Sequence, residues 1–242
     1  MLGKFIFAGC AWAAAACIGA VPSFAARTPA TDSSYEQDYS YARYAPLFGS
    51  SEVYSSSTWR FKQWTDMLAR ADAERRDATH VCSARDDTHC VPAEWQGLID
   101  KLRGLDIRQQ IEIANQAMNR HPYVPTSVNW HRAMYWESPF EFLRYGGQCQ
   151  DYAITKYLLL RAAGVPAEQM RMVVLRDAAI RLDHAVLAVY VNGEPLLLDN
   201  LREGIVPART VSYYHPYYSI NENGWWTHFG GQAMTRVAAN YR

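Results

Sequence analysis

The most constraining stretch of this sequence is a glycine pair followed by a single cysteine and an uninterrupted helical segment. Gly146 and Gly147 precede Cys149, and residues 150–163 contain no glycine or proline before Gly164. This pattern predicts a loop leading into a helix that begins at or just after Cys149. At a helix N-terminus, unpaired backbone N–H groups and the helix dipole favour a thiolate over a thiol. The sequence therefore places a candidate nucleophile at the start of a helix.

A predicted β-hairpin downstream carries two candidate partners for this thiol. Residues 182–191 and 195–200 have the composition of strands, and Asn192–Gly193 between them is typical of a tight turn. If the residues flanking the turn pair with each other, His184 and Asp199 lie diagonally on one face of the hairpin. The proline that opens the second strand favours an edge strand or a wider turn, which leaves other registers open.

A thiol, an imidazole and a carboxylate in this arrangement are what a cysteine nucleophile requires. His184 would take the thiol proton and pass it to the leaving amine, while Asp199 would orient the imidazole. Each residue alone has a more common structural explanation. A lone cysteine such as Cys149 is often a small buried hydrophobe, a strand histidine is often a core residue, and such an aspartate often caps a turn. The combination is what indicates catalysis.

Three segments that carry these residues resemble one known family. They are GGQCQDYAITKY at 146–157, DHAVL at 183–187 and PLLLDN at 195–200. They are similar to the bacterial transglutaminase-like cysteine peptidases, the LapG-type periplasmic proteases, over about residues 59–229. The resemblance implies an α+β fold with a papain-like, transglutaminase-type core, in which the cysteine helix packs on an antiparallel sheet beside extra N-terminal helices. It also implies a cysteine endopeptidase whose triad is Cys149, His184 and Asp199.

The same resemblance implies partners. The expected substrate is a protein, and for LapG-type enzymes it is a large surface adhesin that is cleaved to release biofilm cells. Control comes from an inner-membrane receptor that responds to cyclic-di-GMP. A tryptophan upstream of a Tyr-Trp pair docks into that receptor, and Trp130 matches its position. We therefore expect Trp130 to be solvent-exposed.

The residues beside the cysteine depart from the family pattern. The family usually has acidic residues on both sides, which help to bind calcium, whereas this chain has Gln148 and Gln150 and retains only Asp151. Calcium prefers several charged oxygen ligands, so we expect no required cofactor, with Asp151 as a weak calcium candidate. Loss of negative neighbours also eases thiolate formation. Gln148 could support an oxyanion together with the Cys149 backbone amide.

The N-terminus predicts export. Residues 1–25 contain one lysine, an apolar alanine-rich run and small residues at a cleavage position, which is typical of a secretory signal peptide. The apolar run is short for a transmembrane helix. We therefore expect a periplasmic protein. The chain has a formal net charge of +0 and no basic cluster, which argues against nucleic-acid binding.

Cysteine usage supports a free Cys149. Two of the five cysteines lie in the predicted signal peptide, and Cys82 and Cys90 are close enough in sequence for a local disulfide in an oxidising compartment. A metal site formed by these two cysteines with His80 and His89 is the alternative.

The remaining chain predicts helices followed by an antiparallel sheet, which indicates an α+β domain. Residues 26–57 form an irregular lead-in, and residues 58–242 form the peptidase domain. Helices are predicted at 59–76, from 92 to 102 and at 106–118, and strands at 170–176, 182–191, 196–200 and 211–220. Two rival functions stay open: acyl transfer by a transglutaminase or amidase through the same thioester, and a non-catalytic binding module on the same fold.

Overall fold

The computed structural model describes residues 44–77 and 90–230. The predicted signal peptide, most of the lead-in and the residues after 230 lie outside this range. The predicted Cys82–Cys90 disulfide stays a prediction, because Cys82 also lies outside it. Within the described ranges, no helix combines the length and apolar character needed to cross a bilayer.

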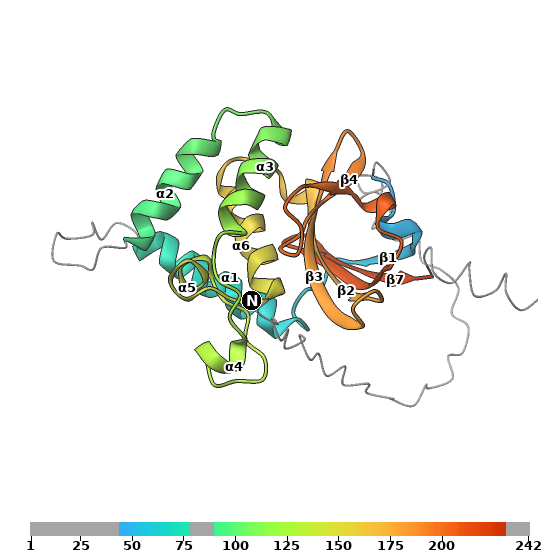
Figure 1. The fold of residues 1–242 in the computed structure, drawn as a ribbon, viewed down its shortest axis with the longest axis horizontal. Coiled ribbons are helices and arrows are strands. Elements are labelled where there is room, and N and C mark those ends of the chain that lie inside the picture. Colours follow the sequence, from blue (N-terminus) through green and yellow to red (C-terminus); the bar gives the residue numbers. More distant parts are fainter. Residues whose placement is uncertain (1–43, 78–89, 231–242) are drawn as a thin grey trace, which may run out of the picture.

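In the described part of the chain, six α-helices gather on one side of a strongly curved sheet (Figure 1). The last of them, α6, lies between the sheet and the other helices and is buried on nearly all sides. Its buried residues include the polar side chains of Gln150, Asp151, Thr155 and Lys156. The helices are α1 (Lys62–Asp77), α2 (Val91–Leu102), α3 (Ile107–Met118), α4 (Thr126–Asn129), α5 (Pro139–Tyr145) and α6 (Cys149–Ala162).

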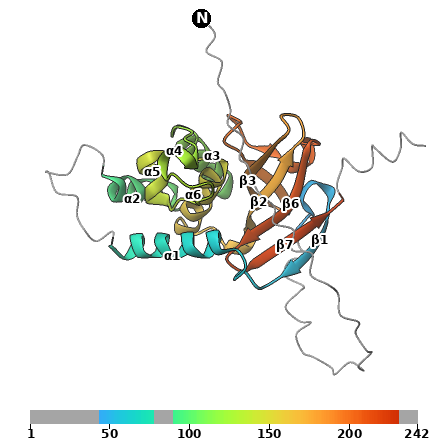
Figure 2. The same ribbon diagram turned by 90° about the horizontal axis from the view of Figure 1, so that it is seen from below.

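Among the described residues, the sheet has seven antiparallel strands in the order β1-β7-β6-β2-β3-β4-β5. Figure 2 shows the strands from below, with α1 running along the helical side. The fold is therefore α+β, as the sequence predicted. The strands are β1 (Ser51–Ser55), β2 (Met170–Asp177), β3 (Leu182–Val191), β4 (Glu194–Leu198), β5 (Val206–Pro207), β6 (Tyr214–Asn221) and β7 (Gly224–Phe229).

Each face of the sheet contributes side chains to its own apolar cluster. On β3, Leu187 and Val189 pack with α6 and the other helices, whereas Val186 and Ala188 face a smaller cluster on the concave side. Alternation along a strand produces this division. His184 lies near the start of this strand and is buried.

The lead-in prediction is wrong in its last residues. Residues 51–55 form β1, which pairs with β7 at the edge of the sheet, and Leu47 and Phe48 before it are buried. The folded domain therefore includes residues before position 58. A five-residue edge strand with half-exposed polar side chains gives little sequence signal, which explains why the boundary was placed too late.

Candidate active site

Cys149 is the first residue of α6, as the glycine loop predicts. The carboxylate of Asp151 holds this helix start, because its Oδ2 accepts a hydrogen bond from the Gln148 backbone at 2.8 Å. Its Oδ1 accepts from the Glu137 backbone at 2.9 Å. These bonds tie the loop before the cysteine to the segment before α5. The thiol is therefore carried on a backbone fixed from two sides.

The two glycines are required by close packing. Gly146 has φ of +70°, and a Cβ there would lie 2.3 Å from the Pro122 carbonyl oxygen. A Cβ on Gly147 would lie 2.8 Å from both the Asp151 and the Glu137 carboxylates. Any side chain at either position would displace backbone or buried charge. The pair therefore allows the chain to reach α6 through a crowded passage.

The predicted hairpin brings His184 and Asp199 together. Val191 pairs with Glu194 across Asn192–Gly193, whose φ angles are +52° and +81°. His184 Nε2 lies 2.9 Å from Asp199 Oδ1, and both side chains are buried. Because this bond uses Nε2, the other ring nitrogen, Nδ1, remains for a second partner. The register predicted from the sequence is confirmed.

Asp199 is held as a carboxylate by several donors. Its Oδ1 also accepts from the Leu201 backbone at 2.9 Å, and its Oδ2 accepts from Tyr214 at 2.6 Å. Arg202 Nε lies 3.4 Å from Oδ2. Burial alone would raise the pKa of Asp199, but its hydrogen bonds and the charge of His184 lower it to about 2. Asp199 is therefore ionised at neutral pH.

Two neighbours of this carboxylate were missed by the sequence analysis. Tyr214 begins β6 inside an aromatic-rich stretch, where nothing distinguishes one tyrosine from the next. Lys156 of α6 is fully buried, and its Nζ has no hydrogen-bond partner among the described residues. Burial lowers the pKa of Lys156 to about 7, and the charge of Asp199 opposes this shift. The sequence does not indicate that this lysine is buried, because a helix commonly carries lysines among its polar residues.

The two glutamines beside the cysteine are engaged in the site. Gln148 Oε1 accepts from the Thr126 hydroxyl at 2.6 Å, so its amide nitrogen is the end that can donate elsewhere. Gln150 donates to Asp151 Oδ2 at 3.1 Å, and its Oε1 lies 3.6 Å from the Cys149 sulfur. A carboxylate at position 150 would place negative charge close to the thiol. The residue at position 150 therefore affects the electrostatics of Cys149.

The residues around Asp151 do not fit a calcium site. Both of its carboxylate oxygens accept N–H groups. Oε1 of the nearby Glu137 accepts from Trp130 at 2.6 Å and from Asn129 at 3.1 Å. Its Oε2 has no hydrogen-bond partner within residues 44–77 and 90–230. Calcium needs six to eight oxygen ligands. Across residues 44–77 and 90–230, no cluster of three His, Cys, Asp or Glu side chains could hold a metal.

The exposure predicted for Trp130 is not observed. The residue is half-buried, with its ring 4.6 Å from that of Tyr135 and 5.8 Å from that of Tyr145. Its indole N–H is bonded to Glu137. A buried acceptor within reach of the indole turns the ring inward, and residue spacing alone cannot reveal such an acceptor.

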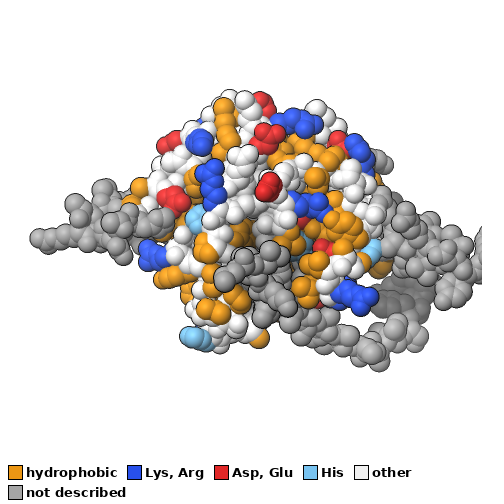
Figure 3. Space-filling view, in the orientation of Figure 1, with side chains coloured by type: hydrophobic (Ala, Val, Ile, Leu, Met, Phe, Trp, Pro, Cys, Tyr) orange, Lys and Arg blue, Asp and Glu red, His pale blue; other side chains and the backbone are white. Residues whose placement is uncertain are grey.

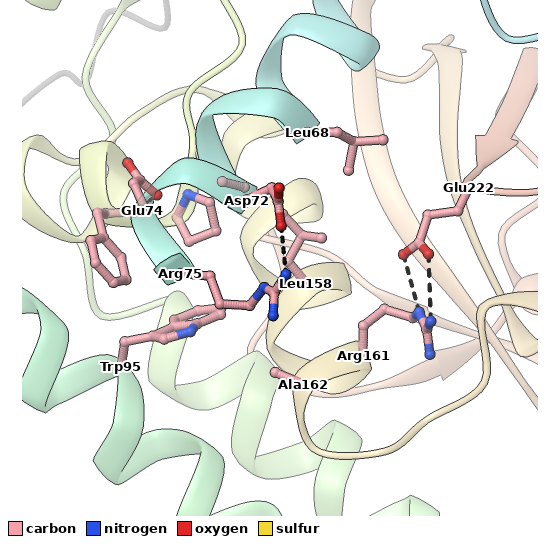
Figure 4. Close-up of a pocket in the computed structure, with 12 residues that line it drawn as sticks. Leu68, Asp72, Glu74, Arg75, Trp95, Leu158, Arg161, Ala162 and Glu222 are labelled. Atoms are coloured by element: carbon pink, nitrogen blue, oxygen red, sulfur yellow. Dashed lines mark hydrogen bonds and ion pairs between the residues drawn. The ribbon is translucent and has the colours of Figure 1, made fainter. Parts of the chain in front are cut away.

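A pocket of about 490 Å³ lies far along α6 from the cysteine (Figure 4). Leu158 and Arg161 from the end of α6, Trp95 from α2 and Asp72 from α1 line it. None of Cys149, His184 and Asp199 does so. On the molecular face drawn in Figure 3, acidic and basic side chains are interspersed, with no single basic patch.

The sequence of the chain also matches a protein-family model. The model of the bacterial transglutaminase-like cysteine proteinases matches residues 78–234, which is more than half of the chain. The chain belongs to this family. It is therefore a cysteine peptidase, and its helix-on-sheet architecture is the papain-like, transglutaminase-type fold.

Solved structures of one family member are also similar. Calcium-bound LapG from Legionella pneumophila is 30% identical, with a TM-score of 0.56, over 69% of this chain and 98% of that chain. The EGTA-treated form of the same protein is 31% identical, with a TM-score of 0.56, over 68% and 91% of the two chains. No curated protein sequence matches this chain.

Proposed function

We propose that this peptidase cleaves a protein substrate through Cys149, His184 and Asp199. The observation that carries the proposal is the buried 2.9 Å bond between His184 Nε2 and Asp199 Oδ1. It lies on the strand against which α6 packs, and α6 begins at Cys149. Such an Asp–His pair leaves Nδ1 as the base for a thiol.

The reaction follows from these positions. Nδ1 of His184 takes the thiol proton, and the sulfur of Cys149 attacks the peptide carbonyl carbon to form a tetrahedral oxyanion. Collapse of this species breaks the C–N bond, and the imidazolium gives its proton to the leaving amine. Water, deprotonated by His184, then attacks the thioester and releases the acid and the thiol. Throughout, the carboxylate of Asp199 stabilises the imidazolium.

Oxyanion stabilisation is assigned to the start of α6. The Cys149 backbone amide is at the first helical position, where the helix dipole favours negative charge. Thr126 holds the oxygen end of the Gln148 amide, and this bond leaves the NH2 end as a second donor. Amide side chains contribute to oxyanion holes in this way.

The proposed setting is the periplasm, reached by means of the signal peptide at residues 1–25. The proposed substrate is a surface adhesin, and the proposed regulator is a cyclic-di-GMP-responsive receptor in the inner membrane. Support comes from the family membership and from the 30% identity to LapG. The half-buried position of Trp130 means that a receptor would have to displace its bond to Glu137 in order to take the ring.

The first test measures the rate of Cys149 alkylation by iodoacetamide against pH in the secreted chain. An unperturbed thiol has a pKa of about 8.5. We expect fast alkylation that persists well below neutral pH, and we expect His184→Ala to move the profile toward the free-thiol value. Cys149→Ala gives the background, and thermal unfolding checks the fold of each variant. A wild-type profile centred near the free-thiol pKa would contradict an activated pair.

Calcium gives a second test. Because N–H donors already occupy the Asp151 carboxylate, we expect the alkylation profile and the thermal midpoint to be the same in EGTA and in calcium. The matched variant carries Gln148→Asp and Gln150→Glu, which restores two carboxylates, and should gain calcium-dependent stabilisation. Loss of alkylation in EGTA and its recovery in calcium with the wild-type chain would overturn calcium independence.

A further inference from the structure

The two oxygens of Asp199 have different partners. Oδ1 accepts from the imidazole of His184, and Oδ2 accepts from the hydroxyl of Tyr214 at 2.6 Å. A carboxylate bonded only at Oδ1 can rotate about its Cβ–Cγ bond. The Tyr214 bond at the second oxygen removes that freedom. The plane of the Asp199 carboxylate is therefore set from both sides.

Tyr214 is itself rigidly placed. It is the first residue of β6, where it pairs with Asp177 of β2, and its side chain is 3% exposed. Its ring lies edge-on to His184 with centroids 5.8 Å apart, and edge-on to Phe48 at 5.9 Å. Burial, followed by the charge of Asp199, raises the pKa of Tyr214. The hydroxyl thus stays protonated and donates to the carboxylate.

We infer that Tyr214 is a positioning residue of the catalytic site, which acts through Asp199. By fixing the carboxylate plane, it keeps Oδ1 directed at His184 Nε2, and in the proposed mechanism this bond orients the imidazole whose Nδ1 serves the thiol. Its contact with the imidazole edge restrains the ring as well. This inference rests on the proposed roles of Cys149, His184 and Asp199.

Other charges around Asp199 remain when the hydroxyl is removed. The Leu201 N–H still donates to Oδ1, Arg202 stays 3.4 Å from Oδ2, and Lys156 still contributes its charge from α6. Tyr214→Phe therefore leaves Asp199 ionised but free to turn its Oδ2 toward Arg202. The His184 imidazolium then loses the aligned acceptor that stabilises it. Because the thiolate is stabilised by this imidazolium, the thiolate also becomes less stable.

The test is the iodoacetamide profile of Tyr214→Phe. We expect the pH of half-maximal alkylation to rise by on the order of one unit. On the rising limb below the wild-type midpoint, the alkylation rate should fall by about tenfold, which is the fold-change that corresponds to a pKa shift of one unit. Tyr217→Phe is the matched control, because it lies on the same strand and removes a 2.9 Å bond to a different carboxylate, that of Asp183.

A double-mutant comparison shows whether Tyr214 acts through Asp199. In an Asp199→Asn background, adding Tyr214→Phe should change the alkylation rate by less than about twofold. An equal loss in both backgrounds would mean that the tyrosine acts independently, and a wild-type profile for Tyr214→Phe would also overturn the inference. If the wild-type chain itself has an unperturbed thiol, the proposed function fails instead. Thermal unfolding of each variant separates positioning from loss of fold.

Discussion

At the residue scale, the structure places two carboxylates in the protein interior beside the cysteine loop. Glu137 and Asp151 are both fully buried. Gly147 lies between them, and a Cβ there would lie 2.8 Å from an oxygen of each carboxylate. Burial raises the pKa of Glu137 to about 7, although hydrogen bonds from Trp130 and Asn129 oppose the shift. Glu137 therefore changes its protonation state near neutral pH.

The raised pKa of Glu137 predicts a pH dependence of stability. The native carboxyl holds its proton up to about pH 7, whereas the unfolded carboxyl releases it near the ordinary value. This contribution to stability is therefore fully present below the unfolded pKa and is lost as pH rises through 7, by on the order of 1–3 kcal/mol. Glu137→Gln keeps the acceptor for Trp130 and should remove this loss. Urea unfolding at a series of pH values measures it.

The control for this prediction is Glu194→Gln, at an exposed ion pair with Arg209. It should keep the wild-type pH dependence. If Glu137→Gln and the wild-type chain lose the same stability across this range, the buried glutamate is not the titrating group.

At the scale of single elements, the sequence predicted those features whose signals lie within a few neighbouring residues. The start of α6 and the register of the hairpin follow from glycine, asparagine and strand patterns that act locally, and both are confirmed. From that register, the pairing of His184 with Asp199 followed directly. The contact between His184 and Asp199 was thus predictable, because one tight turn connects their two strands.

Features that depend on distant packing were not predictable in this way. Tyr214 reaches Asp199 only because β6 pairs with β2 in the middle of the sheet, and the Tyr213–Phe229 stretch contains many aromatic residues with equal local signals. The inward turn of Trp130 depends on Glu137, seven residues later. In each case a single polar contact decides where the side chain lies. Such a contact produces no periodic pattern or composition bias in the sequence.

At the scale of the whole molecule, a largely buried ion pair connects the edge strand β1 to β2 in the middle of the curved sheet. Glu52 of β1 lies 2.7 Å from Arg171 of β2, although β7 and β6 separate these strands in the sheet. The guanidinium also lies 3.7 Å over the Trp226 ring. Glu52 additionally accepts the Leu47 N–H at 2.8 Å. This contact anchors the segment whose next residue, Phe48, packs on Tyr214.

Loss of the Glu52 carboxylate should therefore destabilise the whole domain. Arg171 is 1% exposed, so Glu52→Gln leaves a buried charge without its partner, at an expected cost of about 3–5 kcal/mol in the free energy of unfolding. Urea denaturation measures this cost. The exposed Glu194→Gln should cost at most about 1 kcal/mol, and adding Arg171→Met to Glu52→Gln should recover much of the loss, because the unpaired charge is then gone. Equal costs for the two glutamate variants would mean that the pair does not hold β1 to the sheet.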